Sequence, residues 1–264
     1  MCGLTLKEDP PMARLFDSYV MVDWSAASKP ATGADSIWIG AMTPDSRLKL
    51  AFKATNPPTR AKAIEELNEL LSRCLKRGDR VLMGVDFPLG FPAGTSAALK
   101  LKGEPWQGIR EFLLKEMKDK PDNTNNRFAL AAMMNRRISD GPFPFWGCSK
   151  KDELATLSIK KTREHGPKDI GEFRIVETTA MDAKKARPQP VWKIAYAGAI
   201  GGQTMTGIAT MLEFLEANLE GEPKKQAAHG QAWHVQVLLE LMQRLDLRHV
   251  VLVEQGGTWH QLAQ

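Results

Sequence analysis

Cysteine is scarce in this sequence, which has three among 264 residues. Cys2, Cys74 and Cys148 are odd in number, lie far apart and form no CxxC pair. This pattern argues against a disulfide framework and against a cysteine zinc site, and it is typical of a reducing compartment. We therefore expect a cytoplasmic protein.

Long apolar runs are also missing. No stretch approaches the roughly 18 to 20 apolar residues that cross a bilayer, and the first residues lack the apolar centre of a secretory signal. A composition of 43% hydrophobic and 25% charged residues excludes a disordered chain and supports a sizeable core. We expect no membrane partner, and the sequence leaves the oligomeric state open.

Several catalytic motifs are absent. There is no HExxH, no GxSxG, no P-loop and no glycine-rich dinucleotide fingerprint after a strand. These absences weaken the zinc protease, serine hydrolase, P-loop and dehydrogenase classes. The formal net charge of +5 would help to attract a polyanion, although many ordinary soluble proteins share such a bias.

Alternating and periodic apolar residues predict an α/β fold. Residues 1–18, which include Pro10 and Pro11, are predicted to be a flexible leader, and residues 19–264 a single domain. Strand patterns at 19–25, 36–43 and 47–54 are joined by short turns and predict a three-stranded antiparallel meander. A helix is expected over 60–77, capped by Thr59 and ended by Gly78, before a strand at 81–85. That strand should run parallel to a neighbour, since a helix precedes it.

The remainder predicts a helical and loop-rich insertion at about 88–170, followed by further elements of a mixed sheet. In this part of the chain, helices are expected at 106–118, 126–138, 208–219 and 231–245, and strands at 173–178 and 249–255.

Three carboxylates follow predicted strands: Asp23, Asp86 and Glu177. The carboxyl ends of parallel strands form the rim where α/β sheets bind ligands, so these side chains are expected to converge there. Carboxylates packed closely require a cation or a shared proton, and Mg²⁺ or Mn²⁺ suits oxygen ligands. The alternative is that each acid forms a turn or caps a helix. Glu65 and Glu66 lie at the margins of the first helix and are more typical of a solvated surface.

The order strand, strand, strand, helix, strand with acids at Asp23 and Asp86 resembles the ribonuclease H-like fold. The motifs VDWSA, GVDFPLGFP, the ET of RIVETT, and GGQTMTGI are similar to an uncharacterised family of predicted ribonuclease H-like nucleases. The resemblance covers most of residues 19–245 and implies an acid cluster around one or two divalent metals. Where similar sequences have another acid near the start of the last long helix, this chain has His234.

Three further segments offer substrate contacts. Ser25 follows the first acid in a hairpin whose hydroxyls and amides suit a phosphate oxygen. Gln203 and Thr204 lie in a glycine-rich helix entry, and Arg127 and Arg136 suit phosphate because guanidinium groups donate two hydrogen bonds at once. For each, local packing or a solvated face is the competing interpretation.

These observations predict a metal-dependent phosphodiester hydrolase that acts on nucleic acid or a nucleotide. Asp23 and Asp86 would hold Mg²⁺ or Mn²⁺, and Glu177 would complete the site. The alternative is a degenerate ribonuclease H-like domain that binds a nucleotide or anionic metabolite without catalysis. Some relatives carry names from cofactor biosynthesis.

Overall fold

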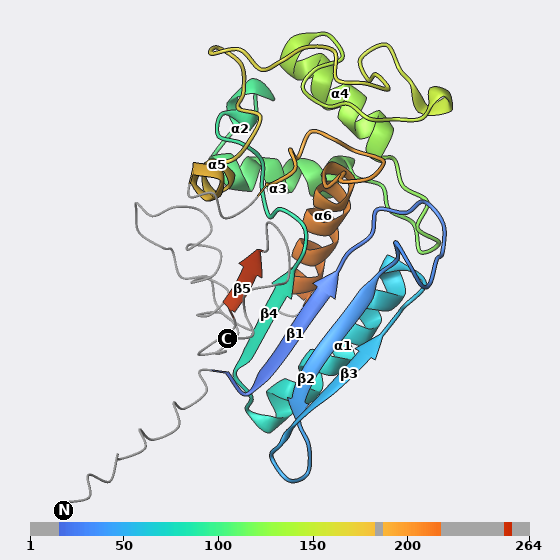
Figure 1. Cartoon of the computed structure of the whole chain (residues 1–264), viewed down its shortest axis with the longest axis vertical. Helices are drawn as coiled ribbons and strands as arrows, with labels where there is room; N and C mark the ends of the chain where they lie inside the picture. Colours follow the sequence, from blue (N-terminus) through green and yellow to red (C-terminus); the bar gives the residue numbers. More distant parts are fainter. Residues whose placement is uncertain (1–15, 183–186, 218–250, 255–264) are drawn as a thin grey trace, which may run out of the picture.

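A computed structural model describes residues 16–182, 187–217 and 251–254. The protein is α/β, with a mixed sheet in the order β3-β2-β1-β4-β5 and a helical layer beyond one end of the sheet (Figure 1). None of the described helices is long and apolar enough to cross a bilayer.

The first three strands form the expected antiparallel meander. They are β1 (Ser18–Asp23), β2 (Trp38–Pro44) and β3 (Leu50–Thr55), with Val22 opposite Ile39 and Met42 opposite Phe52. Alternate β1 residues face the core, so Val20 and Val22 are buried. The meander prediction is confirmed.

Helix α1 (Arg60–Arg77) begins and ends where its caps predict. The Thr59 hydroxyl accepts a 3.2 Å hydrogen bond from the Lys62 amide, and Gly78 takes the left-handed conformation with φ of 77°. The following strand, β4 (Val81–Val85), runs parallel to β1 with Val85 opposite Val22. Strand β5 (Val251–Glu254) then pairs parallel with β4, within the range predicted for the last strand.

The helical layer contains α2 (Thr95–Ala98), α3 (Pro105–Glu116), α4 (Arg127–Ser139) and the short 3₁₀ helix Lys150–Asp152. The two longer helices confirm the predictions at 106–118 and 126–138. Their apolar residues form a second core with Trp192, Val191 and Met205, which lie beyond the predicted end of the insertion.

Helix α6 (Gly201–Ala217) connects the two cores. Its Met205 and Ile208 belong to the core of the helical layer, whereas Met211 packs with the sheet residues. The helix runs from the helical layer toward the sheet (Figure 1). The helix begins seven residues before its predicted start at 208. That early start places the GGQT segment in its first turn rather than in a preceding loop.

The strand predicted at 173–178 is wrong, because helix α5 (Ile175–Asp182) occupies most of it. Ile175 and Val176 are exposed rather than packed in a sheet. The hydroxyls of Thr178 and Thr179 both donate 2.8 Å hydrogen bonds to the Ile175 carbonyl, which favours the helical turn. The predicted helix at 231–245, His234 and residues 1–15 lie outside the described residues.

Candidate acid pair and phosphate site

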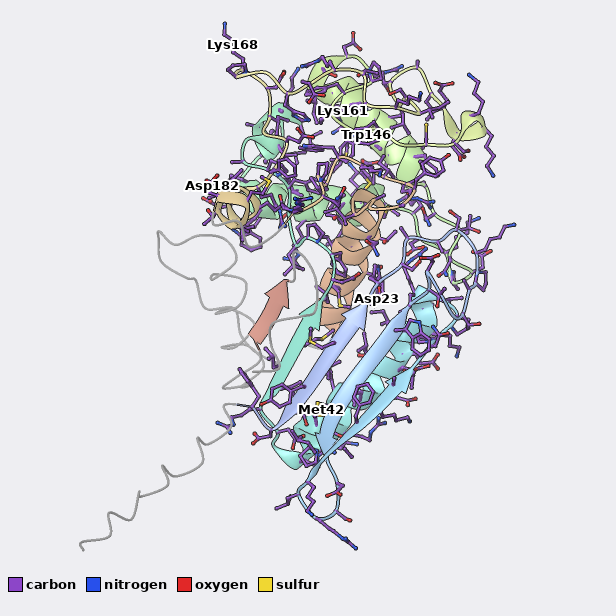
Figure 2. All side chains as sticks on the ribbon, in the orientation of Figure 1. Asp23, Met42, Trp146, Lys161, Lys168 and Asp182 are labelled. Carbon is purple, nitrogen blue, oxygen red and sulfur yellow. The ribbon has the colours of Figure 1, made fainter. Side chains whose placement is uncertain are left out.

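The structure brings Asp23 and Asp86 together at the ends of adjacent parallel strands. Figure 2 labels Asp23 at the end of β1. The Trp24 amide donates a 2.8 Å hydrogen bond to Oδ1 of Asp86, and the Asp86 amide donates one of 3.2 Å to the Val22 carbonyl. The two carboxyl groups share a hydrogen bond. The backbone after β1 therefore holds the carboxylate of Asp86, and the Asp86 amide extends the pairing of the two strands.

Burial and mutual repulsion change the ionisation of this pair. Burial, followed by the negative charge of Asp23, raises the pKa of Asp86 to about 7, although the Trp24 amide opposes the shift. Burial also raises the pKa of Asp23, while the hydrogen bond with Asp86 lowers it. Near neutral pH the two carboxyl groups therefore share a proton, in the position where a cation would neutralise both.

Asp35 is a third carboxylate near the pair that the sequence analysis missed. It lies exposed in the β1–β2 connection with φ of 55°, and its negative charge contributes to the raised pKa of Asp23. No group of three His, Cys, Asp or Glu that could hold a metal ion occurs among the described residues. The acid site in that part of the chain is thus a pair.

Glu177 does not complete the site. It is buried on α5, where it accepts hydrogen bonds of 2.7 Å from both the backbone amide and Nη2 of Arg174. Its carboxylate is therefore engaged in a local ion pair that fixes the start of α5, rather than in a cluster with Asp23 and Asp86. We expected it at the sheet rim because 173–178 resembled a strand.

The first helix offers no replacement for Glu177. The side chain of Glu65 is exposed and pairs with Lys62 at 2.5 Å, as expected for a surface glutamate. Glu66 is half-buried, and neither belongs to a three-ligand cluster within the described ranges.

Of the residues predicted to contact substrate, three instead form hydrogen bonds with the protein backbone. Ser25 is buried; its hydroxyl donates to the Asp35 carbonyl at 3.3 Å and accepts from the Ala27 amide at 3.2 Å. The Gln203 side chain donates to the Trp24 carbonyl. Thr204 is fully buried and donates at 2.8 Å to the Ile200 carbonyl, so its hydroxyl serves α6 itself.

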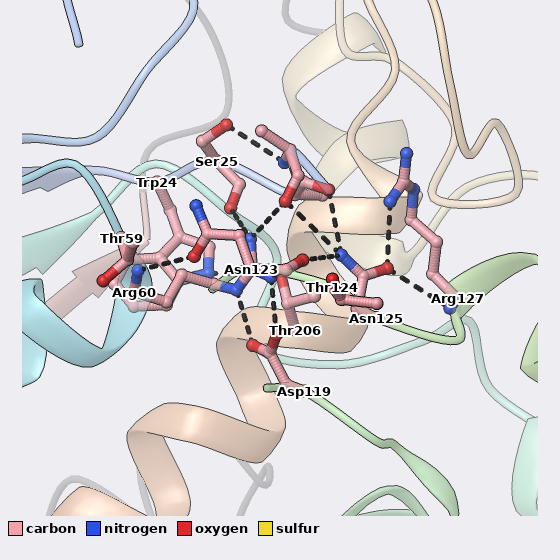
Figure 3. A network of polar contacts seen from close by, with 12 residues as sticks. Trp24, Ser25, Thr59, Arg60, Asp119, Asn123, Thr124, Asn125, Arg127 and Thr206 are labelled. Atoms are coloured by element: carbon pink, nitrogen blue, oxygen red, sulfur yellow. Dashed lines mark hydrogen bonds and ion pairs between the residues drawn. The ribbon is translucent and has the colours of Figure 1, made fainter. Parts of the chain in front are cut away.

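Arg127 and Arg136, the two arginines predicted to bind phosphate, lie at different ends of α4. Arg127 opens α4 beside the loop after β1, and its Nη1 donates to Oγ of Ser28 at 2.6 Å and Oδ1 of Asn125 at 2.9 Å (Figure 3). Arg136 is exposed nine residues further along the same helix, about 13 Å away at the rise of an α-helix. Only Arg127 reaches the candidate site.

A polar network that the sequence analysis missed surrounds the loop 24–29 (Figure 3). Its centre is Arg60, which is 1% exposed and forms a two-pronged ion pair with Asp119, both distances being 2.5 Å. Asn123 and Asn125 extend the network. One signal was available: an arginine in the first turn of a helix is unfavourable beside the helix dipole, which indicates a partner elsewhere.

A buried hydrogen bond links this loop to α6. The indole N–H of Trp24 donates at 3.2 Å to the Thr206 hydroxyl, and the Trp24 ring packs against Phe87 directly after Asp86. The Trp24 side chain thus connects the ends of β1 and β4 to α6.

No family model matches the chain, and no curated protein or solved structure matches it. The resemblance to ribonuclease H-like nucleases therefore rests on the sequence motifs.

Proposed function

We propose that the protein is a metal-dependent phosphodiester hydrolase of ribonuclease H-like fold that acts on nucleic acid or a nucleotide. The observation that carries the proposal is the contact between Asp23 and Asp86 at the ends of adjacent parallel strands. Ligands of α/β sheets bind at this edge.

The acid pair fits Mg²⁺ or Mn²⁺ by the chemistry of its donors. Magnesium is commonly held by one or two carboxylates, with water and substrate phosphate completing the shell, so the pair does not need Glu177 as a third ligand. Burial and the negative charge of Asp23 raise the pKa of Asp86 to about 7, and a bound cation would relieve the same repulsion in place of the proton. A bound cation would polarise the phosphoryl group and lower the pKa of a coordinated water.

The chain's own residues supply orientation and charge. The Trp24 amide fixes Oδ1 of Asp86, and the hydrogen bond between Val22 and Asp86 fixes the backbone beneath it. Arg127 stands beside the same loop and would bind a phosphate oxygen.

The ribonuclease H-like assignment is supported by the element order. Three antiparallel strands, α1 and the parallel strand β4 follow one another in the order that the resemblance implies. Asp23 and Asp86 also end the strands on which the resemblance places metal ligands.

The second candidate is a domain that binds a nucleotide or anionic metabolite without cleaving it. One observation favours it: within the described ranges the acid pair lacks a third metal-ligating carboxylate, because Glu177 is paired with Arg174. Fold alone does not distinguish hydrolysis from binding.

Cleavage assays separate the two candidates. The protein is incubated with Mg²⁺ or Mn²⁺ and with single-stranded, duplex and hybrid substrates, alongside Asp23→Asn and Asp140→Asn. Asp140 is an exposed residue with φ of 52°, a conformation that asparagine tolerates, so its variant is the matched control. Hydrolysis should require Asp23 and survive the control substitution; equal cleavage by Asp23→Asn would refute the proposal.

A further inference from the structure

Five carbonyl oxygens of the loop Trp24–Lys29 accept hydrogen bonds from side chains elsewhere in the chain. Gln203 donates to the Trp24 carbonyl, and Nη1 of Arg60 donates to those of Ser25 at 2.8 Å and Ala27 at 2.9 Å. The Asn125 amide donates to the Ala26 carbonyl at 3.3 Å, and the Asn123 amide to the Lys29 carbonyl at 3.1 Å. Side chains from α1, α6 and the 119–125 turn therefore turn these carbonyls toward the protein (Figure 3).

Arg60 makes this arrangement stable. Its guanidinium is buried, its charge is balanced by Asp119, and its remaining hydrogen bonds go to backbone carbonyls, including that of Asn123 at 2.8 Å. Hydrogen bonds to a charged donor are stronger than those between neutral groups. Arg60 is therefore a positioning residue for the loop.

The direction of the carbonyls sets the direction of the amides. In a trans peptide the carbonyl of one residue points opposite to the N–H of the next, and the one cis peptide among the described residues is Phe143–Pro144. Inward carbonyls at 24, 25 and 27 thus turn the amides of Ser25, Ala26 and Ser28 away from the residues that hold the loop. None of these three amides has a hydrogen-bond partner in the part of the chain that the structure describes. Backbone amides left free in this way attract anions.

Arg127 provides a second, independent indication of an anion. Its Nε is buried and has no hydrogen-bond partner, and no carboxylate forms an ion pair with it among the described residues. Nη1 reaches Oγ of Ser28, at the end of the loop that carries the free amides. Burial, followed by the charge of Arg60, lowers the pKa of Arg127 to about 10, so the side chain remains cationic at neutral pH. The charges of Asp152 and Asp119 oppose this shift without forming an ion pair with Arg127. A partly buried cation that no carboxylate contacts among the described residues favours a negatively charged ligand.

We propose that the loop Trp24–Lys29 and Arg127 form a subsite for a phosphate monoester, such as the terminal phosphate of a nucleotide or nucleic-acid strand. A monoester has three terminal oxygens and up to two negative charges, whereas an internal diester has two such oxygens and one charge. Three free amides and a guanidinium therefore suit the monoester better. The inference deepens the proposed function by naming its substrate class, and it rests on that function only for the nucleotide part of the ligand.

The test is carried out in EDTA, so that it does not depend on metal. Binding of a 5′-phosphorylated tetrathymidylate is compared with that of its 5′-hydroxyl counterpart, with inorganic phosphate as the competitor. We expect the phosphorylated strand to bind at least tenfold more tightly and inorganic phosphate to displace it. Equal affinity for the two strands would overturn the proposal.

Substitutions on α4 test whether the phosphorylated strand binds at Arg127. Arg127→Met should abolish the preference for the phosphorylated strand, whereas Arg137→Met, which removes an exposed arginine from the same helix, should retain it. Preference unchanged in Arg127→Met would contradict the assignment. Asp23→Asn should keep the preference, so a failure of the metal proposal is distinguishable from a failure of this one.

A spectroscopic readout covers the case in which Arg127→Met does not fold. In wild-type protein labelled with ¹⁵N-serine and ¹⁵N-alanine, added phosphate should shift the amide protons of Ser25, Ala26 and Ser28. Unchanged positions for all three at saturating ligand would overturn the proposal.

Discussion

The backbone amide of Trp24 donates a 2.8 Å hydrogen bond to Oδ1 of Asp86 and so joins the end of β1 to the end of β4. This bond, the carboxyl contact with Asp23 and the anchored loop that follows place the acids and the free amides within one short segment.

Asp86→Asn should increase stability most at alkaline pH. The folded chain keeps the Asp86 proton up to about pH 7, whereas the unfolded chain loses it near the ordinary value of 3.8. Stability supplied by this group is therefore complete below about pH 4 and is lost as pH rises to 7. After allowance for solvent screening, we expect a gain of about 1–2 kcal/mol for the variant at pH 8 relative to pH 4.5. Urea unfolding of wild type and variant at pH 4.5 and pH 8 measures this gain. A difference in unfolding free energy between the two proteins that is the same at both pH values would contradict the raised pKa of Asp86.

Arg60→Met should destabilise the protein by about 3–5 kcal/mol, because it leaves Asp119 charged and unpaired beside the loop. Arg73→Met, on the exposed face of the same helix, should cost less than about 0.5 kcal/mol. Urea unfolding provides both values. The double variant Arg60→Met with Asp119→Leu should recover part of the loss, and a strictly additive result would show that the pair is not coupled.

Glu177→Gln should reduce stability by about 1–2 kcal/mol and leave metal binding unchanged. The carboxylate is buried against Arg174, so the substitution weakens a charged hydrogen bond at the start of α5. Thermal unfolding and Mn²⁺ titration measure the two effects separately. A large loss of Mn²⁺ affinity would restore Glu177 to the metal site.

Gly201→Ala should destabilise the protein by about 1–3 kcal/mol or more, because an added Cβ would lie 2.2 Å from the Val191 carbonyl oxygen. The backbone there cannot move without shifting the start of α6, where Gln203 donates a hydrogen bond to the Trp24 carbonyl. Gly141→Ala is the control, since its Cβ would meet no atom closer than 3.9 Å. Similar unfolding free energies for the two variants would refute this account of the α6 entry.

Local sequence signals predicted the elements with clear caps and periods. Thr59 and Gly78 bounded α1 because their side-chain and backbone preferences act within one turn. The convergence of Asp23 with Asp86 was also predictable, since it follows from the parallel pairing of two strands that each end in an acid.

The errors arose where short patterns are ambiguous or partners are distant. A short apolar run such as 173–178 suits a strand or a helix equally, and the ion pair with Arg174 favours the helix. Arg60 and Asp119 are 59 residues apart, so no local pattern predicts their contact. The inward carbonyls at 24–29 depend on that same contact.

Direct titration with Mn²⁺, followed by electron paramagnetic resonance at pH 8, tests the central claim that Asp23 and Asp86 form a cation site. We expect saturable binding in wild type and in Asp140→Asn, a loss of at least tenfold in Asp23→Asn and in Asp86→Asn, and weaker binding at pH 6, where Asp86 retains its proton. Mn²⁺ affinity that is the same in wild type and Asp86→Asn would contradict the account.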